Sequence, residues 1–122
     1  MTETMSSVET EYRLEAFARA TIANGFGSQI NVGPRLPGER WEIEGFSATG
    51  TAVAKLQIMR GNSFDATRQI DVTVRADSDS SDTKLTLMSG ESLSFWWTAG
   101  TNGATMTCNI LGKRFVPGRR GY

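Results

Sequence analysis

The sequence contains no histidine among its 122 residues, and this absence removes several kinds of chemistry together. Histidine is the commonest general base, the proton carrier of catalytic triads and the commonest metal ligand. Enzymes without histidine use carboxylate pairs, lysine or tyrosine, but Glu42, Glu44 and Asp71 lie at the polar positions of alternating segments, where a solvated role is expected. We therefore expect no enzymatic activity and no cofactor.

Paired cysteines, long apolar runs and net charge are also missing. The single cysteine, Cys108, excludes an internal disulfide, and its position within a strand-like segment is typical of a buried, inert thiol. No run approaches the length of a membrane-spanning helix, and the N-terminus has neither the basic nor the apolar region of a secretory signal. Thirteen basic and thirteen acidic residues give a net charge of zero, so nothing directs the chain towards nucleic acid or an anionic membrane.

Glycine, by contrast, is abundant, with 13 residues that separate short segments of alternating apolar and polar side chains. The clearest segment covers residues 68–75, where Ile70, Val72 and Val74 alternate with polar residues. This period of two predicts a β-strand in which these three side chains are buried, whereas Asp71 and Thr73 are accessible. Similar segments predict further strands at residues 41–45, 52–59, 84–87, 93–97 and 104–115.

Residues 9–23 fit two structures. Leu14, Phe17 and Ala18 would line one face of a helix, because they recur at helical spacing. Leu14, Ala18 and Ile22 also belong to an alternation that is typical of a strand. We favour the strand, because the surrounding segments are all strand-like.

Turn-forming residues lie between the predicted strands. Asn102–Gly103 suits a tight hairpin reversal, and residues 89–91 form a second turn. About eight short strands at this spacing predict an all-β fold, a single compact β-sandwich with jelly-roll or Greek-key-like connections and extended terminal arms. We place a flexible N-terminal arm at residues 1–10, the β-sandwich at residues 11–116 and a basic C-terminal arm at residues 117–122.

The candidate interface residues lie in an aromatic pair and near the C-terminus. Adjacent strand residues point to opposite faces, so one of Trp96 and Trp97 is expected in the core and the other on the surface, covered by the chain itself or by a partner. Residues 113–122 carry four positive charges and no acidic residue, whereas the N-terminus is acidic, and we expect both arms to dock on neighbouring subunits. The candidate interface residues are Trp96, Trp97, Arg114, Phe115, Val116, Arg119, Arg120 and Tyr122.

The segment 77–82 holds three carboxylates and three hydroxyl groups. Hard oxygen ligands of this kind bind Ca²⁺, but the segment lacks the glycine and the terminal glutamate of an EF-hand loop. A polar loop is the alternative that we favour, so we expect no metal. If the segment did bind Ca²⁺, the ligands would come from Asp77, Asp79 and Asp82.

Three parts of the sequence resemble a known group of proteins. They are Gly38-Glu-Arg-Trp-Glu-Ile43, the segment 79–100, and the end of the last predicted strand at residues 112–120. Their order is similar to that in small virion proteins of tailed phages that infect actinobacteria, which are generally labelled minor tail proteins and are β-sandwich modules. The resemblance covers most of residues 30–120 and consists of turn and strand patterns rather than a catalytic signature. It implies assembly in the host cytoplasm and residence in the virion.

The resemblance implies a non-enzymatic structural protein, a minor tail or tail-tip subunit that docks through its arms and an exposed face of the sandwich. Two alternatives remain open: a capsid decoration protein that stabilises adjacent capsomers, and a carbohydrate-binding β-sandwich module with a host-surface glycan as its ligand. The expected partners are other virion proteins and copies of the chain itself, with no nucleic acid and no membrane.

Overall fold

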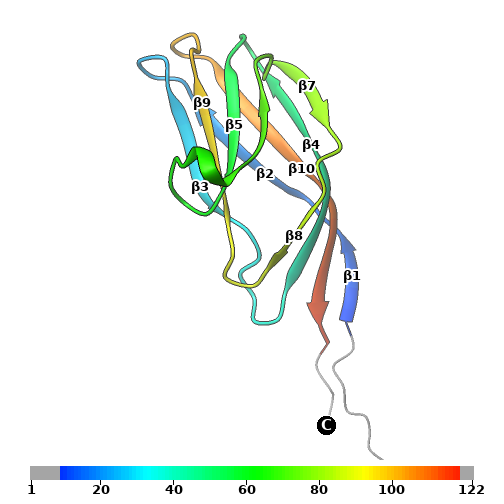
Figure 1. Ribbon diagram of the computed structural model, residues 1–122. Helices are drawn as coiled ribbons and strands as arrows, with labels where there is room; N and C mark the ends of the chain where they lie inside the picture. Colours follow the sequence, from blue (N-terminus) through cyan, green and yellow to red (C-terminus); the bar gives the residue numbers. More distant parts are fainter. Residues whose placement is uncertain (1–8, 119–122) are drawn as a thin grey trace, which may run out of the picture.

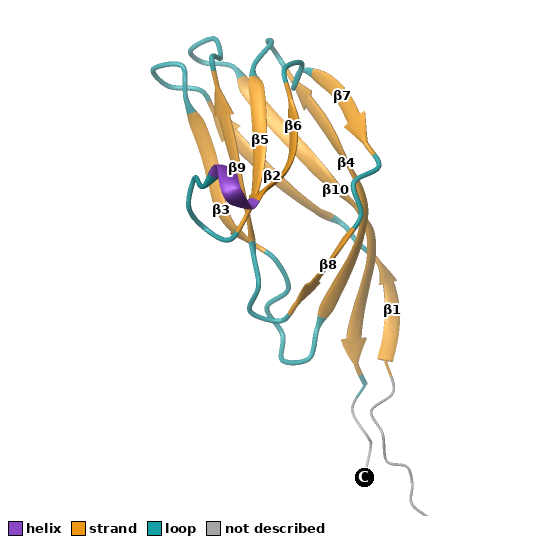
Figure 2. Cartoon of the chain, in the orientation of Figure 1, coloured by secondary structure: helices purple, strands orange, loops and turns teal. Residues whose placement is uncertain are grey.

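The computed structural model describes residues 9–118, which form ten β-strands and one turn of 3₁₀-helix (Figures 1 and 2). Within this range no helix is long and apolar enough to cross a membrane. The elements are β1 (Glu9–Arg13), β2 (Ala16–Thr21), β3 (Gly27–Val32), β4 (Arg40–Gly50), β5 (Lys55–Arg60), η1 (Ala66–Arg68), β6 (Gln69–Thr73), β7 (Ser78–Ser81), β8 (Leu85–Met88), β9 (Leu93–Thr98) and β10 (Thr105–Pro117).

The strands form two antiparallel sheets that pack face to face. In the first sheet the long strands β4 and β10 lie side by side at the centre. Both β1 and β2 pair with β10, one after the other, and both β7 and β8 pair with β4 in the same way. Each of these two pairs is therefore one edge strand with an interruption. The second sheet has the order β3-β9-β5-β6.

The strand order is that of a jelly roll. When each interrupted edge is counted as one strand, the chain has eight strand positions, with the order 1-8-3-6 in the first sheet and 2-7-4-5 in the second. Every neighbouring pair is antiparallel, and the chain crosses repeatedly between the two sheets, as in the double Greek key of a jelly roll. The prediction of an all-β sandwich of about eight strands is confirmed.

The core lies between the facing sides of the two sheets. From the second sheet, Leu56, Phe95 and Trp97 enter the core, and each is 1% exposed or less. Leu14, Ala18 and Ile22 are also buried, at the edge formed by β1 and β2. The strand interpretation of residues 9–23 is therefore confirmed, and the helical alternative is wrong.

The prediction for residues 68–75 is wrong about which side chains are buried. Val72 is 45% exposed and Val74 is 67% exposed, whereas Ile70 packs against the core. The reason is a β-bulge: Asp71 pairs with Ile58 and Gln69 pairs with Met59, so Ile70 is an additional residue in β6. The bulge shifts the alternation by one residue. Beyond the bulge Val72 and Val74 face outward, and Asp71 and Thr73 face the other sheet.

The two turns occur where the sequence predicts them, but the turn at Asn102–Gly103 does not form a hairpin within one sheet. The amide of Ala104 donates to the carbonyl of Thr101 over 3.0 Å, which closes a turn. The strands on either side, β9 and β10, belong to different sheets, so the turn carries the chain across the sandwich. Residues 89–91 connect β8 and β9 in the same manner, with a bond of 2.9 Å from the amide of Glu91 to the carbonyl of Met88.

Candidate interaction surfaces

The tryptophan pair in β9 divides between the core and the surface, as strand alternation requires. Trp97 is fully buried and stacks on Phe95, with 6.3 Å between ring centroids. Trp96 is half-buried on the outer face of the second sheet. Its indole N–H donates to the hydroxyl of Ser94 over 2.8 Å, so the indole has a fixed orientation. Trp96, and not Trp97, is therefore available to a partner.

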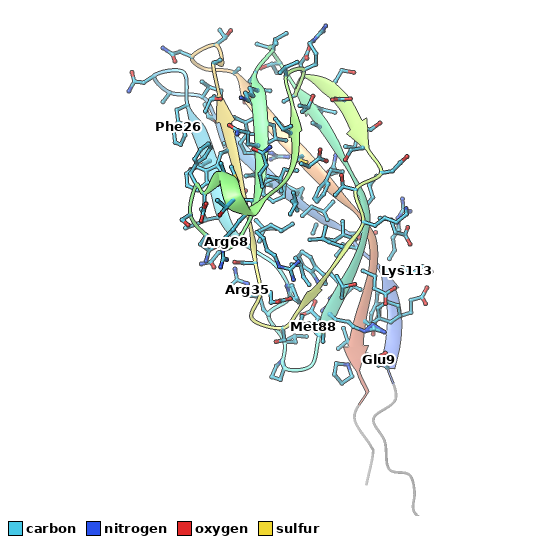
Figure 3. The ribbon with its side chains drawn as sticks, viewed as in Figure 1. Glu9, Phe26, Arg35, Arg68, Met88 and Lys113 are labelled. Carbon is cyan, nitrogen blue, oxygen red and sulfur yellow. The ribbon has the colours of Figure 1, made fainter. Side chains whose placement is uncertain are left out.

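Two phenylalanines from separate loops surround Trp96 and form with it an aromatic patch, defined as Phe26, Phe64 and Trp96. The Phe26 ring lies 6.0 Å from that of Trp96, and the Phe64 ring lies 5.7 Å away and edge-on to it. Both phenylalanines are nearly half exposed, at 43% and 49%. Figure 3 shows Phe26 at the side of the sandwich, at the start of β3. Large exposed aromatic groups at one place on a small protein are typical of interaction surfaces.

Local sequence places the first phenylalanine of the patch. Asn24 and Gly25 have positive φ angles of 54° and 76°, as the central residues of a type I′ turn require. Ala23 and Phe26 exchange two backbone hydrogen bonds, of 2.9 and 3.0 Å, which close this turn. The Asn24–Gly25 turn is thus the sequence signal that could have placed Phe26 at the end of a hairpin turn. No comparable signal identifies Phe64, which lies in the loop after β5.

A row of side chains on the outer face of the second sheet continues from the aromatic patch across the strands. Ser28, Trp96, Gln57 and Val72 are opposite one another in adjacent strands, so they share this face. The amide of Gln57 donates to that of Gln69 over 2.7 Å. The surface thus combines apolar rings with hydroxyl and amide groups that can form hydrogen bonds with a partner.

The candidate residues Arg114, Phe115 and Val116 lie inside β10, between β1 and β4, within the range predicted for the sandwich. The Arg114 guanidinium bonds to the carboxylate of Glu39 over 2.6 Å, and the Arg40 guanidinium covers the Phe115 ring at 4.0 Å from its centroid. These side chains therefore make contacts within the chain. Arg119, Arg120 and Tyr122 lie outside the described residues.

Glu39 is a buried acid with an unusual number of partners. Its carboxylate accepts hydrogen bonds from the amides of Arg35 and Leu36, over 3.0 and 2.9 Å, and from the indole of Trp41, over 2.9 Å. Burial alone would raise the pKa of Glu39, but the bonds from Leu36, Arg114, Trp41 and Arg35 outweigh burial and lower the pKa to about 2. The carboxylate is thus a charged structural anchor.

The structure does not bring Asp77, Asp79 and Asp82 together into a metal site. Ser78–Ser81 is strand β7, so the expected polar loop is largely an edge strand. Asp77 pairs with Arg75 over 3.3 Å, and Asp79 accepts hydrogen bonds from Thr73 and from the amide of Ser80. Across residues 9–118, no group of three or more acidic or cysteine side chains is placed to hold a metal ion.

The side of the sandwich between β6 and β7 is closed by a polar seam. The Asp71 carboxylate of β6 accepts hydrogen bonds from the hydroxyls of Ser81 and Thr83. Ser81 is the last residue of β7, at the edge of the other sheet, and Thr83 lies two residues further along the chain. Behind the seam is a small cavity of about 40 Å³, lined in part by Asp71 and Cys108. Burial, and next the charge of Asp71, raises the pKa of the Cys108 thiol to about 12, so the thiol is inert in the folded protein.

No family model, no curated protein and no solved structure matches this chain. The fold is therefore identified from its own strand order.

Proposed function

We propose that this chain is a non-enzymatic structural subunit of a tailed-phage virion, a minor tail or tail-tip protein that docks on neighbouring subunits through the aromatic patch. The observation that carries the proposal is the patch itself, in which Trp96 is fixed by Ser94 and is flanked by two phenylalanines that are 43% and 49% exposed. Rigid aromatic side chains of this kind supply much of the binding free energy in protein interfaces. The resemblance of most of residues 30–120 to small virion proteins supports a location in the virion.

Two further features support a structural role. Jelly rolls are common in viral capsid proteins, where the rigid double sheet provides a shape to pack against. Glu39 and Cys108, which have strongly shifted pKa values, are buried inside the fold, and the cavity that Cys108 lines is only about 40 Å³. An acid that is bonded to four donors and a thiol with a raised pKa are poorly suited to proton transfer or nucleophilic attack.

The test is incorporation of variants into purified phage particles. Phe64→Ser removes a ring from the aromatic patch, and Phe17→Ser removes a ring of equal exposure, 49%, from β2 on the first sheet. We expect Phe64→Ser to lower the copy number in particles, while Phe17→Ser leaves it unchanged. Particles that contain no copies of the wild-type chain would refute the virion role. Equal incorporation of both variants would refute docking through the patch. A particle map would distinguish a tail position from a capsid decoration position.

The carbohydrate-binding alternative is favoured by the same patch, because sugar rings stack on exposed aromatic side chains and jelly rolls are also lectin folds. The row that contains Ser28 and Gln57 would supply hydrogen bonds to sugar hydroxyls. A sugar-binding module should bind glycans as an isolated chain, and Trp96→Ala should abolish that binding. An assembly subunit should bind none and should be found in particles at a fixed copy number.

A further inference from the structure

The outer edge of β1 differs from the other sheet edges. An edge strand presents unpaired backbone N–H and C=O groups, to which another strand can add. In each of the five other edge strands, a side-chain oxygen accepts a hydrogen bond from at least one backbone N–H, whereas β1 has no such bond within residues 9–118. In each of the following pairs the first residue lies in the strand and donates its N–H, and the second accepts through its side chain: Arg19 and Gln29 for β2, Asn31 and Asn62 for β3, Val72 and Asp71 for β6, Ser80 and Asp79 for β7, and Met88 and Glu91 for β8.

The backbone direction of β1 follows from its pairing with β10. The amide of Leu14, the residue after β1, donates to the carbonyl of Gly112 in β10 over 2.9 Å. Backbone groups in an antiparallel strand alternate in direction, so those of Thr10 and Tyr12 also face β10. The N–H and C=O groups of Glu9, Glu11 and Arg13 consequently face away from β10, towards the open edge.

The position and exposure of β1 leave this edge accessible. All five side chains of the strand are exposed, on both faces of the sheet. In Figure 1, β1 forms the border of the lower part of the molecule, beside the end of β10 and away from the second sheet. A strand held from one side only, with neither face covered, gains stability if a second strand pairs with it.

We propose that β1 pairs with β1 of a second copy of this chain, antiparallel, about a two-fold axis at Glu11. In this register Glu9 lies opposite Arg13 of the second copy, and Glu11 lies opposite its own equivalent. The outward N–H and C=O groups of these three residues then meet those of the second copy. Such an interface is isologous and closes as a dimer.

Side-chain chemistry favours this self-pairing. The alternation Glu9, Glu11, Arg13 places an acid opposite a base twice, and the intervening Thr10 and Tyr12 form cross-strand pairs of a β-branched and an aromatic residue, which stabilise antiparallel strands. The like-charged Glu11 pair is the one unfavourable contact. It falls at a hydrogen-bonded position, where the side chains are farther apart. Lys113 lies 4.0 Å from the Glu11 carboxylate in the same chain and offsets part of the repulsion.

Charged residues on an edge strand also serve to prevent strand addition. A charge of one sign repels a second copy in any register. The pattern in β1 is instead complementary to itself when the strand is reversed, with Glu9 matched to Arg13. The β1 edge and the aromatic patch are separate surfaces, so the dimer does not depend on the proposed virion role.

The test is sedimentation velocity on the full chain from about 1 µM to about 1 mM. We expect the average mass to rise with concentration from the monomer value of 13.3 kDa towards twice that value. Glu11→Pro removes an outward N–H that β10 does not use, and proline is tolerated at such edge positions. It should raise the dissociation constant about tenfold or more. The control Glu11→Gln keeps the N–H and removes the like-charge pair, and should bind as tightly as the wild type or more tightly.

A charge exchange tests the register. Arg13→Glu should raise the dissociation constant, and the double variant Glu9→Arg with Arg13→Glu should restore it, because the two residues remain opposite each other. Hydrogen exchange of the wild type provides a local measurement, in which the amides of Glu11 and Arg13 become protected as the concentration rises, while those of Thr10 and Tyr12 are protected throughout.

A mass of 13.3 kDa at every concentration would overturn the proposal. So would a Glu11→Pro variant that dimerises like the wild type, a charge exchange that does not restore pairing, or amides of Glu11 and Arg13 whose exchange is independent of concentration. Phe64→Ser, the variant that tests docking in particles, should leave the dimer unchanged, so the two proposals can fail separately.

Discussion

Arg114 Nε lies 2.6 Å from Glu39 Oε2, and this ion pair joins β10 to the loop that precedes β4. The Glu39 side chain is 4% exposed, and its carboxylate also accepts bonds from Trp41 and from two loop amides. A buried ion pair whose remaining hydrogen bonds are satisfied resists the loss of either partner. The pair therefore fixes the lower part of the first sheet, to which β1 is attached.

Folding stability should depend on pH through Glu39. Its pKa is about 2 in the folded protein against an ordinary value of 4.5, so the unfolded chain binds more protons between these values. The stabilisation, about 3 kcal/mol, is complete above pH 4.5 and is lost as pH falls towards 2. Urea unfolding of the wild type and of Glu39→Gln from pH 2 to pH 7 measures it. The difference between the two proteins should shrink at low pH, and a constant difference would contradict the prediction.

The exposure of β6 predicts that Val72→Ala has little effect. Val72 is 45% exposed, so its truncation should cost less than about 0.5 kcal/mol of unfolding free energy. Val32 is 7% exposed, and the same truncation there should cost about 1–3 kcal/mol. Denaturant titrations of both variants give the comparison. Equal losses at the two positions would mean that the outer face of β6 is covered in solution.

The periodicity of residues 68–75 predicts a strand correctly but cannot show which side faces the core. The alternation in sequence is regular, and the bulge at Ile70 that reverses it depends on the pairing with Ile58 and Met59 in a different strand. The pattern of residues 14–22 predicts its buried face correctly, because Leu14, Ala18 and Ile22 keep their phase against β10. Local pattern thus gives the element, and long-range register decides its orientation.

The interaction surfaces also depend on long-range contacts that a local sequence pattern cannot predict. Strand alternation separates Trp96 from Trp97 from sequence alone. The partners of Trp96 come from two loops, and no short-range pattern brings Phe26 and Phe64 together, because they are 38 residues apart in the sequence. Arg114 belongs to a basic segment in the sequence, but its partner Glu39 lies far away along the chain. The alternation of residues 104–115 places Arg114 in a strand correctly, but only the tertiary structure shows that its side chain bonds to Glu39 instead of a partner.

Gly112 should not tolerate a side chain. It lies at the bulge where β10 changes register against β4, and a Cβ atom would overlap the carbonyl oxygen of Glu42 and approach the Cα atom of Ile43 to 3.0 Å. Gly112→Ala should cost about 2–4 kcal/mol of unfolding free energy. The control Gly103→Ala also has a positive φ, of 87°, but has open space around it, and should cost about 1 kcal/mol. Thermal unfolding of both variants distinguishes a steric clash from backbone strain alone, and equal costs would exclude the clash.

Cys108 should report on the opening of the polar seam. With a pKa of about 12, about one thiol in ten thousand is ionised at pH 8, so a thiol reagent should label the folded protein very slowly. Asp71→Asn removes the charge but keeps an oxygen that can accept bonds from Ser81 and Thr83. This variant should be labelled faster than the wild type by less than about tenfold, because only the pKa of the thiol is lowered.

Asp71→Ala removes those bonds as well, so the seam between β6 and β7 should open more often and expose the cavity that Cys108 lines. Labelling should then exceed that of Asp71→Asn by about tenfold or more, because local opening limits access to a buried group. Reaction rates at pH 8 with all three proteins in native buffer provide the measurement. If the alanine and asparagine variants label at the same rate, the hydroxyl bonds do not hold the seam closed, and Asp71 affects the labelling of Cys108 only through its charge.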